Sequence, residues 1–232
     1  MKFYSGICFD EQGISTSIRA MHMQTELMGN ISKNVNGFDK IGYQRQESVV
    51  SSFAEYVGPH ALSTIQDESV GRLYNSNNPL DFALAQSGYF QCKTANGIKL
   101  TRDGRFKLDK NGNLLTLDDN KVLSKDGTAI KFKKIPQNLS DIKVNLDGDI
   151  TTFDKDTNKE IKIASISVVS GNGSINEDPN VRQGFVESSN VSMHQEMFNL
   201  IPIRRNFDAN HQMIVIQNDE LTKTIQELGK AT

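Results

Sequence analysis

The sequence is poor in several features that would point to particular classes of protein. Its 232 residues contain two cysteines, Cys8 and Cys92, with no CxxC pair or Cys/His spacing around either. We therefore expect two unpaired thiols, without a disulfide framework or a zinc site. Lysine and arginine number 26 against 28 aspartates and glutamates, and this near balance offers no positive field for nucleic acid. No apolar run approaches the ~20 residues that cross a bilayer, and Asp10 interrupts the N-terminal segment before a signal-type apolar core develops. The sequence thus predicts no nucleic-acid partner, no membrane insertion and no cleaved leader.

The sequence also lacks a constellation of residues that would carry catalysis or bind a metal. The four histidines, at positions 22, 60, 194 and 211, form no HExxH motif. Gly13 to Ser17 lacks the second glycine of a nucleophile elbow. The segment 109–113 begins like a calcium loop but has no glycine at the sixth position and no carboxylate at the twelfth. We predict no catalytic residue, no metal and no cofactor, and hence no enzyme.

The N-terminal region has the periodicity of an amphipathic helix. No proline occurs from Gly13 to Val35, and apolar residues recur at heptad-like spacing. The apolar positions of this seam are Ile14, Ile18, Met21, Met28 and Val35. Thr25 and Ser32 fill its remaining positions, so one imperfect stripe favours a helix that needs a partner.

The C-terminal region repeats this pattern over a longer stretch. Steps of four and three residues lead through Met193, Met197, Leu200, Arg204, Phe207, His211, Ile214, Asn218, Leu221, Ile225 and Leu228, of which eight of eleven are apolar. Ser192 and Gln195 fit a capping box, which predicts a helix that begins near Met193 and ends near Gly229. Pro202 falls inside it, and we expect a kink or a break into two helices there.

Between the two ends the apolar period changes to two and turn signals accumulate. The turn dipeptides are Asn96-Gly97, Asp103-Gly104, Asn111-Gly112, Asp126-Gly127 and Asp147-Gly148. Such pairs supply the positive φ angles of tight hairpins. Strands are predicted at 98–101, 105–108, 130–132, 142–144 and 161–169. The apolar phase of the last run changes between Ile163 and Ile166, which indicates a bulge or a strand buried on both faces.

Together these patterns predict an α+β protein in which N- and C-terminal helices form a coiled-coil-like terminal domain and a central domain is all antiparallel β. We divide the chain into an N-terminal helix (1–38), an extended connector (39–78), a central β-domain (79–182), and a return segment with the C-terminal helix (183–232).

Such an organisation favours assembly. A single apolar stripe does not offset the conformational entropy lost in ordering a long helix. The two end helices could pair within one chain but would still leave apolar surface uncovered, so copies of the chain are its natural partners. The alternative is a non-catalytic adaptor or chaperone-like module that uses the same helices to hold one partner. A fixed small oligomer would favour the adaptor, and open-ended growth would favour the polymer.

Motifs in three regions carry a resemblance to a known family. Asn30-Ile31-Ser32-Lys33-Asn34-Val35-Asn36 and the following Gly42-Tyr43-Gln44-Arg45 are similar to a signature near the N-terminus of the bacterial flagellar rod and hook proteins. The central motif comprises Asn78-Pro79-Leu80-Asp81, then Gly88-Tyr89-Phe90, then Thr101-Arg102-Asp103-Gly104. The C-terminal motif comprises Gln183-Gly184 through Asn190-Val191, then Glu196-Met197, Asn199-Leu200 and Ala209-Asn210.

The sequence departs from the family pattern at three places. Three extra residues separate Asn36 from Gly42, Gln86 replaces a glycine, and Pro202 interrupts the last helix. The resemblance nevertheless covers nearly the whole chain, and the short connector is more similar to rod than to hook proteins.

The resemblance implies a structural subunit of the basal-body rod, in the periplasm-spanning part of the flagellum. It implies assembly into a helical tube that transmits torque, with copies of itself and other rod and hook proteins as neighbours. It also implies delivery through the flagellar export apparatus without cleavage of a signal peptide.

Overall fold

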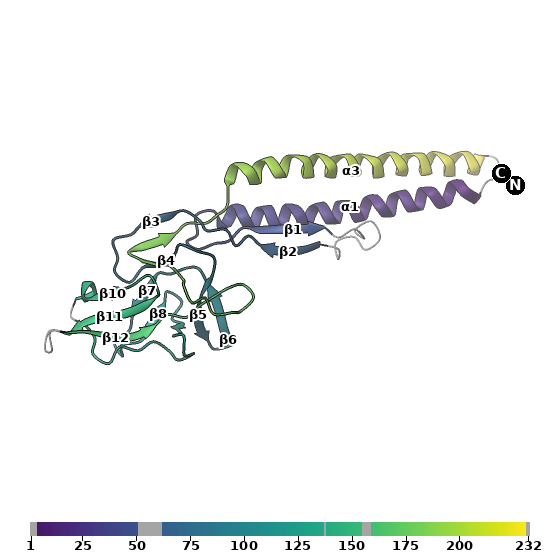
Figure 1. The fold of residues 1–232 in the computed structure, drawn as a ribbon. Helices are drawn as coiled ribbons and strands as arrows, with labels where there is room; N and C mark the ends of the chain where they lie inside the picture. The colour runs from purple at the N-terminus through teal and green to yellow at the C-terminus, as the bar shows by residue number, and fades with distance from the viewer. Residues whose placement is uncertain (1–3, 51–61, 137, 155–158, 231–232) are drawn as a thin grey trace. The chain divides into compact units, whose positions relative to one another are not determined.

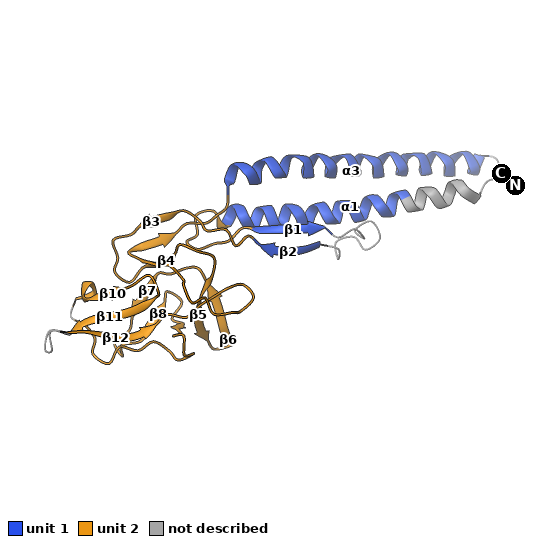
Figure 2. Cartoon of the chain, in the orientation of Figure 1, with its two compact units in different colours: residues 1–36, 46–66, 192–232 blue, residues 37–45, 67–191 orange. Residues whose placement is uncertain are grey.

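The computed structural model describes residues 4–50, 62–136, 138–154 and 159–230, with side chains from residue 13 onward except that of residue 154. The chain divides into two compact units, coloured separately in Figure 2. Unit 1 comprises residues 1–36, 46–66 and 192–232, and unit 2 comprises residues 37–45 and 67–191.

Unit 1 is a helix pair with a β-hairpin. Helices α1 (Tyr4–Gly37) and α3 (Met193–Lys230) lie side by side (Figure 1). The side chain of Asn34 lies 3.3 Å from that of Glu196, and the Gln217 side chain covers Gly13, so the two helices run antiparallel. Strands β1 (Gln46–Val50) and β2 (Leu62–Gln66) pair antiparallel.

Unit 2 contains the remaining strands and a short 3-10 helix. They are β3 (Leu73–Asn75), β4 (Phe82–Leu84), β5 (Tyr89–Thr94), β6 (Gly97–Thr101), β7 (Phe106–Leu108), β8 (Leu114–Thr116), β9 (Lys121–Val122), η2 (Leu139–Asp141), β10 (Ile142–Val144), β11 (Asp149–Asp154), β12 (Lys159–Ser165), β13 (Val168–Val169), β14 (Val181–Gln183) and β15 (Phe185–Glu187). The largest sheet has the order β13-β5-β9-β8-β7, with β6 also paired to β5, and a second sheet has the order β10-β11-β12. Strands β14 and β15 return to pair with β4 and β3. All these pairings are antiparallel.

The core of unit 2 is apolar and aromatic at its centre. The ring of Phe106 lies 5.6 Å from that of Phe82 and 5.3 Å from that of Phe90, the latter edge-on at 84°. Burying one such side chain contributes roughly 1.5–3 kcal/mol. The rest of the core consists of Leu80, Leu84, Cys92, Leu114, Val122, Ile130, Phe132, Ile142, Ile150, Ile166, Val168 and Val181.

The α+β class, with a helix at each end and an antiparallel middle, is confirmed. Strands β6, β7 and β10 occupy the predicted runs. The run 161–169 divides into β12, which pairs with β11, and β13, which pairs with β5. The register of β11 with β12 shifts between Ile150 and Thr151 and skips Ile163, so the predicted bulge is confirmed. Beyond it the chain leaves this sheet and joins the other at β13.

Within residues 130–132 one isolated bridge, from Lys131 to Asn113, takes the place of the expected strand, so that prediction is wrong. The Ile130 N–H donates to the carbonyl of Val122, whereas the Phe132 N–H donates to that of Gly112. Because successive donors find different partners, the segment forms no continuous ladder with one strand.

The expected hairpin turn at Asp103-Gly104 is also wrong. Gly97, Gly112, Gly127 and Gly148 have positive φ, but Gly104 does not. A Cβ on Gly104 would lie 1.7 Å from the carbonyl oxygen of Phe82. Glycine is required there because another strand passes against its Cα, and no turn is involved.

The segment 39–78, expected as an extended connector, contains β1, β2 and β3. Residues 51–61 within it lie outside the described residues. The side chain of Asn30 on α1 donates hydrogen bonds to Ser48 and Thr64. This hairpin face is therefore polar, which removes the alternation by which strands are recognised.

Helix α3 begins at Met193 as predicted, and the Gln195 N–H approaches the Ser192 hydroxyl at 3.5 Å. The helix continues through Pro202 to Lys230, and Figure 1 shows it without a sharp bend. The predicted break into two helices is therefore wrong. Pro202 has no N–H to donate to the Phe198 carbonyl one turn earlier. Because Pro202 lies on the exposed side of α3, water can donate to that carbonyl instead.

Candidate assembly interface and motif network

The face that α1 turns toward α3 has mostly polar side chains at its fully buried positions, although Ala20 and Leu27 are half-buried on the same face. Its buried positions are Ser17, Gln24, Ile31 and Asn34. The side-chain oxygens of Gln24 and Gln217 are buried without a hydrogen-bond partner among the described atoms. A polar seam of this kind fixes register more than it adds stability.

The predicted apolar seam of α1 is rotated from these buried positions by roughly 50–100° around the helix. Ile14, Met21, Met28 and Val35 are half-buried, and Ile18 is exposed. The stripe thus runs beside the α3 contact, and part of it faces solvent.

The predicted seam of α3 is divided between two environments. The half-buried members are Met193, Leu200, Phe207, Ile214 and Leu221. The exposed apolar members are Met197, Ile225 and Leu228. Its three polar members, at positions 204, 211 and 218, are exposed as well.

Asn34 holds the start of β1. Its side-chain oxygen accepts from the Gln46 N–H and its amide donates to the Gln46 carbonyl, both at 2.8 Å, so the side chain imitates a neighbouring strand. It also approaches Glu196, which is almost fully buried. Asn36, which belongs to the same motif, is exposed.

Asn190 plays the corresponding part in unit 2. Its side-chain oxygen accepts from the Arg45 N–H at 2.7 Å, and its amide donates to the carbonyls of Asp67 and Ser69. One side chain therefore joins three separate stretches of chain. A residue with only a donor or only an acceptor could not replace it.

Arg102 and Glu187 form a buried ion pair. The Nε of Arg102 lies 2.8 Å from the Glu187 carboxylate, and their side chains are 0% and 3% exposed. Arg102 also donates to the Gln86 carbonyl, and Glu187 accepts from the Gly71 N–H. Burial raises the pKa of Glu187 above its ordinary value, and Arg102 opposes that rise.

The other central motif residues support the chain where β4 and β14 meet. Leu80 is in the core, and the Pro79 carbonyl accepts from the Gln183 amide. The Asp81 carboxylate accepts from Asn78, while its carbonyl accepts from the N–H of Gly184, whose φ of 77° favours glycine.

The remaining motif positions have more local contacts. Gly88 has a φ of 150°, and Asp103 forms an ion pair with Arg105 at 2.7 Å. On α3, the Asn210 amide donates to the Asn206 carbonyl of the preceding turn.

Sequence reasoning did not nominate Glu187, Glu196 or Gln24, although the structure buries all three. Glu187 and Glu196 lie inside the C-terminal motif, each with an apolar neighbour on one side, Val186 and Met197 respectively, and that position in the motif was the available signal. Gln24 carried no signal, because a glutamine on the exposed side of a helix has the same sequence context.

The described residues show no metal cluster of three or more His, Cys, Asp or Glu side chains. Neither described helix has an apolar stretch able to cross a membrane. Cys92 is free, and burial raises its pKa to about 12, so it is a poor nucleophile. The side chain of Cys8 lies outside the described residues.

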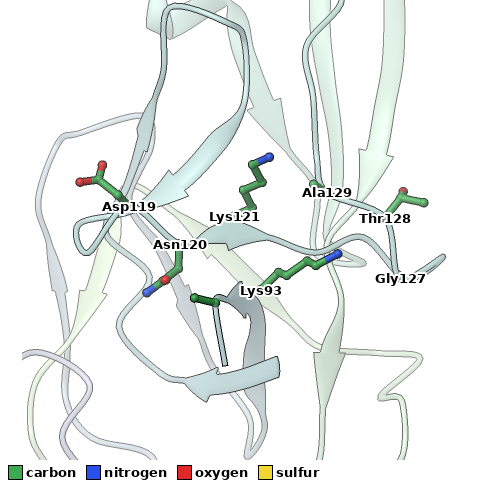
Figure 3. A pocket seen from close by; sticks show the side chains of 8 residues that line it. Lys93, Asp119, Asn120, Lys121, Gly127, Thr128 and Ala129 are labelled. Atoms are coloured by element: carbon green, nitrogen blue, oxygen red, sulfur yellow. The ribbon is translucent and has the colours of Figure 1, made fainter. Parts of the chain in front are cut away.

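A pocket on the outer side of the main sheet offers two amines. Lys93 and Lys121 are paired across β5 and β9 and line it with Asp119 and the segment 127–129 (Figure 3). The Asp119 carboxylate already pairs with Lys107 at 2.7 Å. The Thr128 hydroxyl is hydrogen-bonded to Ser124, and the structure pairs it with neither lysine of the lining.

Comparison with known proteins relates this arrangement to one family. Residues 83–152 match the family model described as the flagellar hook protein FlgE/F/G D1 domain. Residues 182–227 match the model described as the flagellar basal body rod FlgEFG protein C-terminal region.

Full-length relatives agree with these two matches. The flagellar basal-body rod protein FlgF of Rhizobium meliloti is 25% identical over 94% of this chain and 98% of its own length. FlgF of Mesorhizobium japonicum is 28% identical over 85% of this chain and 91% of its own. The rod protein FlgG of Bacillus subtilis is 29% identical over 72% of this chain and 70% of its own. The chain belongs to the flagellar basal-body rod and hook family, a family of structural proteins and not of enzymes.

Proposed function

We propose that this chain is a structural subunit of the flagellar basal-body rod that assembles through its terminal helices into a helical, torque-transmitting tube. Relatives that match it over nearly their whole length carry the name of basal-body rod proteins. Its neighbours in the proposed tube are copies of itself and other rod and hook proteins. The rod crosses the periplasm, and the chain reaches it through the flagellar export apparatus.

One observation carries the proposal: both terminal helices keep apolar side chains exposed although they pack side by side. Ile225 and Leu228, near the end of α3, are 69% and 67% exposed. They continue the helical face on which Ile214 and Leu221 lie, since steps of three, four and seven residues return to one side of a helix. Isolated apolar residues on a surface are common, but a row along one helical face indicates a contact.

We propose that the assembly interface consists of the predicted seams, in coiled-coil-like packing with helices of neighbouring copies. In this packing, a neighbouring copy first covers the exposed members of the two seams, which are Ile18, Met197, Ile225 and Leu228. The division into terminal segments 1–38 and 183–232 around a connector and a β-domain is part of the same proposal.

Sedimentation against protein concentration tests this function. The full chain should grow into open-ended assemblies, and Ile225→Glu together with Leu228→Glu should raise the concentration at which growth begins at least about tenfold, because two charges would enter an apolar seam. Leu117→Glu with Leu146→Glu is the matched control, since both leucines are exposed in unit 2. It should leave growth unchanged.

The adaptor alternative predicts a different result. A small oligomer of fixed size that persists after deletion of residues 193–228 would exclude the polymer and favour a module that holds one partner.

A further inference from the structure

The side of α3 that faces away from α1 carries a second set of exposed residues. We name it the outer face; between residues 194 and 219 its members are His194, Met197, Phe198, Ile201, Arg205, Asp208, Gln212, Val215, Ile216 and Asp219, all exposed, and Lys223, Gln226 and Lys230 continue the same side toward the end of α3. At 100° per residue they fall within a sector of about 100°, opposite the half-buried positions that face α1. Ile225 and Leu228 lie outside this sector, and Met197, at its edge, is the one residue that the outer face shares with the predicted seam.

The chemistry of the outer face is arranged symmetrically about its middle. Arg205 and Asp208 lie at the centre, with Ile201 and Gln212 outside them. Apolar pairs follow on both sides, at 197–198 and at 215–216, and the ends are His194 and Asp219.

A two-fold rotation about a point between residues 206 and 207 therefore places unlike charges together and apolar groups together. It brings Arg205 opposite Asp208 of the second copy, and Phe198 opposite Val215. The same rotation brings Met197 opposite Ile216 and His194 opposite Asp219. Self-complementarity of this kind is the requirement for an interface between two identical surfaces.

The central charges have no competing partner. Within the described part of the chain, neither Arg205 nor Asp208 takes part in an ion pair, although they are three residues apart on one helix. A parallel pair in register would instead place Arg205 against Arg205 and Asp208 against Asp208, and like charges at such spacing repel.

We propose that two copies of the free subunit pair antiparallel through the outer face of α3. This inference goes beyond the proposed function, because a tube whose subunits all point the same way does not repeat an antiparallel pair. The pair is instead a resting form of the unassembled subunit, in which the exposed apolar residues of the outer face are covered.

A charge-exchange cycle tests the pairing by sedimentation equilibrium, in full-length protein carrying Ile225→Glu and Leu228→Glu so that growth through the seam is suppressed. Arg205→Asp alone and Asp208→Arg alone should each weaken the dimer at least about tenfold. Both changes together restore unlike charges across the two-fold and should return the dissociation constant to within about threefold of the starting protein. Asp126→Arg, in an exposed turn of unit 2, is the control for net charge and should have no effect.

Spin labels then determine the direction of the two helices. Ala209 and Glu227 are exposed and lie on the same side of α3, 18 residues apart. With Cys8→Ser and the buried Cys92 retained, a label at position 209 should give a short distance, because the two sites are offset by only about 8 Å along the helices. A label at position 227 should give a distance of about 60 Å.

Three results would overturn the proposal. Equal distances from the two labels would indicate a parallel pair, and a double charge exchange that does not restore association would exclude the Arg205–Asp208 contact. A monomer at all concentrations up to about 500 µM would exclude the pair itself, because that range covers even weak specific interfaces. None of these results bears on growth through the seam, so the proposed function is tested separately.

Discussion

The two units of this protein bury opposite kinds of side chain. In unit 2, fifteen buried residues form one largely apolar core. In the described part of unit 1, Ile31 is the one buried hydrophobic residue, against Ser17, Gln24, Asn34 and Glu196. Unit 2 thus has an apolar core of its own, whereas unit 1 positions its elements largely by hydrogen bonds. Both units leave large apolar side chains exposed, and in unit 1 most of these lie on α3. The difference shows how one chain can combine a stable domain with a surface available for contact.

The largest expected effect comes from removing a core side chain of unit 2 and comparing it with the same change in unit 1. Phe90→Ala should lower the free energy of unfolding by about 3–5 kcal/mol, because the cavity sits among packed rings. Met213→Ala, at a side chain that is 52% exposed on α3 and belongs to neither proposed contact surface, should change it by less than about 0.5 kcal/mol. Urea titrations followed by circular dichroism measure both values. Similar losses from the two variants would contradict the comparison.

A smaller effect should follow from the one buried ion pair found in the described part of unit 2. Arg102→Met leaves Glu187 charged in a buried site and should cost about 3 kcal/mol. Adding Glu187→Gln should recover more than half of that loss, since no uncompensated charge then remains. The more exposed pair of Arg105 with Asp103 is the control, and Arg105→Met should cost less than about 1 kcal/mol. Urea titration of all three variants gives the comparison; equal costs for Arg102 and Arg105 would show that burial does not matter here.

The smallest expected effect is a gain in unit 1. Gly29 is exposed within α1, and a Cβ built on it meets no atom within 4 Å. Gly29→Ala should therefore stabilise the helix by about 0.5–1 kcal/mol. The thermal transition of the helical circular dichroism signal measures it. Gly104→Ala is the control and should lower stability, because a Cβ there would collide with the carbonyl of Phe82. If Gly29→Ala lowered stability as well, α1 would have to be covered at Gly29.

Local chemistry made much of the fold predictable. The capping residue Ser192 placed the start of α3 near Met193, where the helix begins, and dipeptides such as Asn96-Gly97 marked turns correctly. Predictions failed where a distant partner decided the outcome. Asp103-Gly104 has turn composition, yet its glycine is needed because Phe82 passes close to it.

The pairing of β1 with β2 was missed for a related reason. Its face is occupied by Ser48 and Thr64, which bond to Asn30, so no apolar alternation is present in the sequence. The faces of α1 were missed in the same way, because Ser17 and Gln24 are buried by α3 although neither is apolar.

By itself, the sequence determined that helices begin and end the chain, that antiparallel strands fill the middle, and which family the motifs resemble, because periodicity, caps and turn residues act over short stretches. The tertiary structure decided which face of each helix is buried, that α3 continues through Pro202, and that Asn34, Asn190 and Arg102 are held by partners distant in sequence. These outcomes depend on hydrogen bonds and close contacts between remote segments, and no local pattern records which segments will meet.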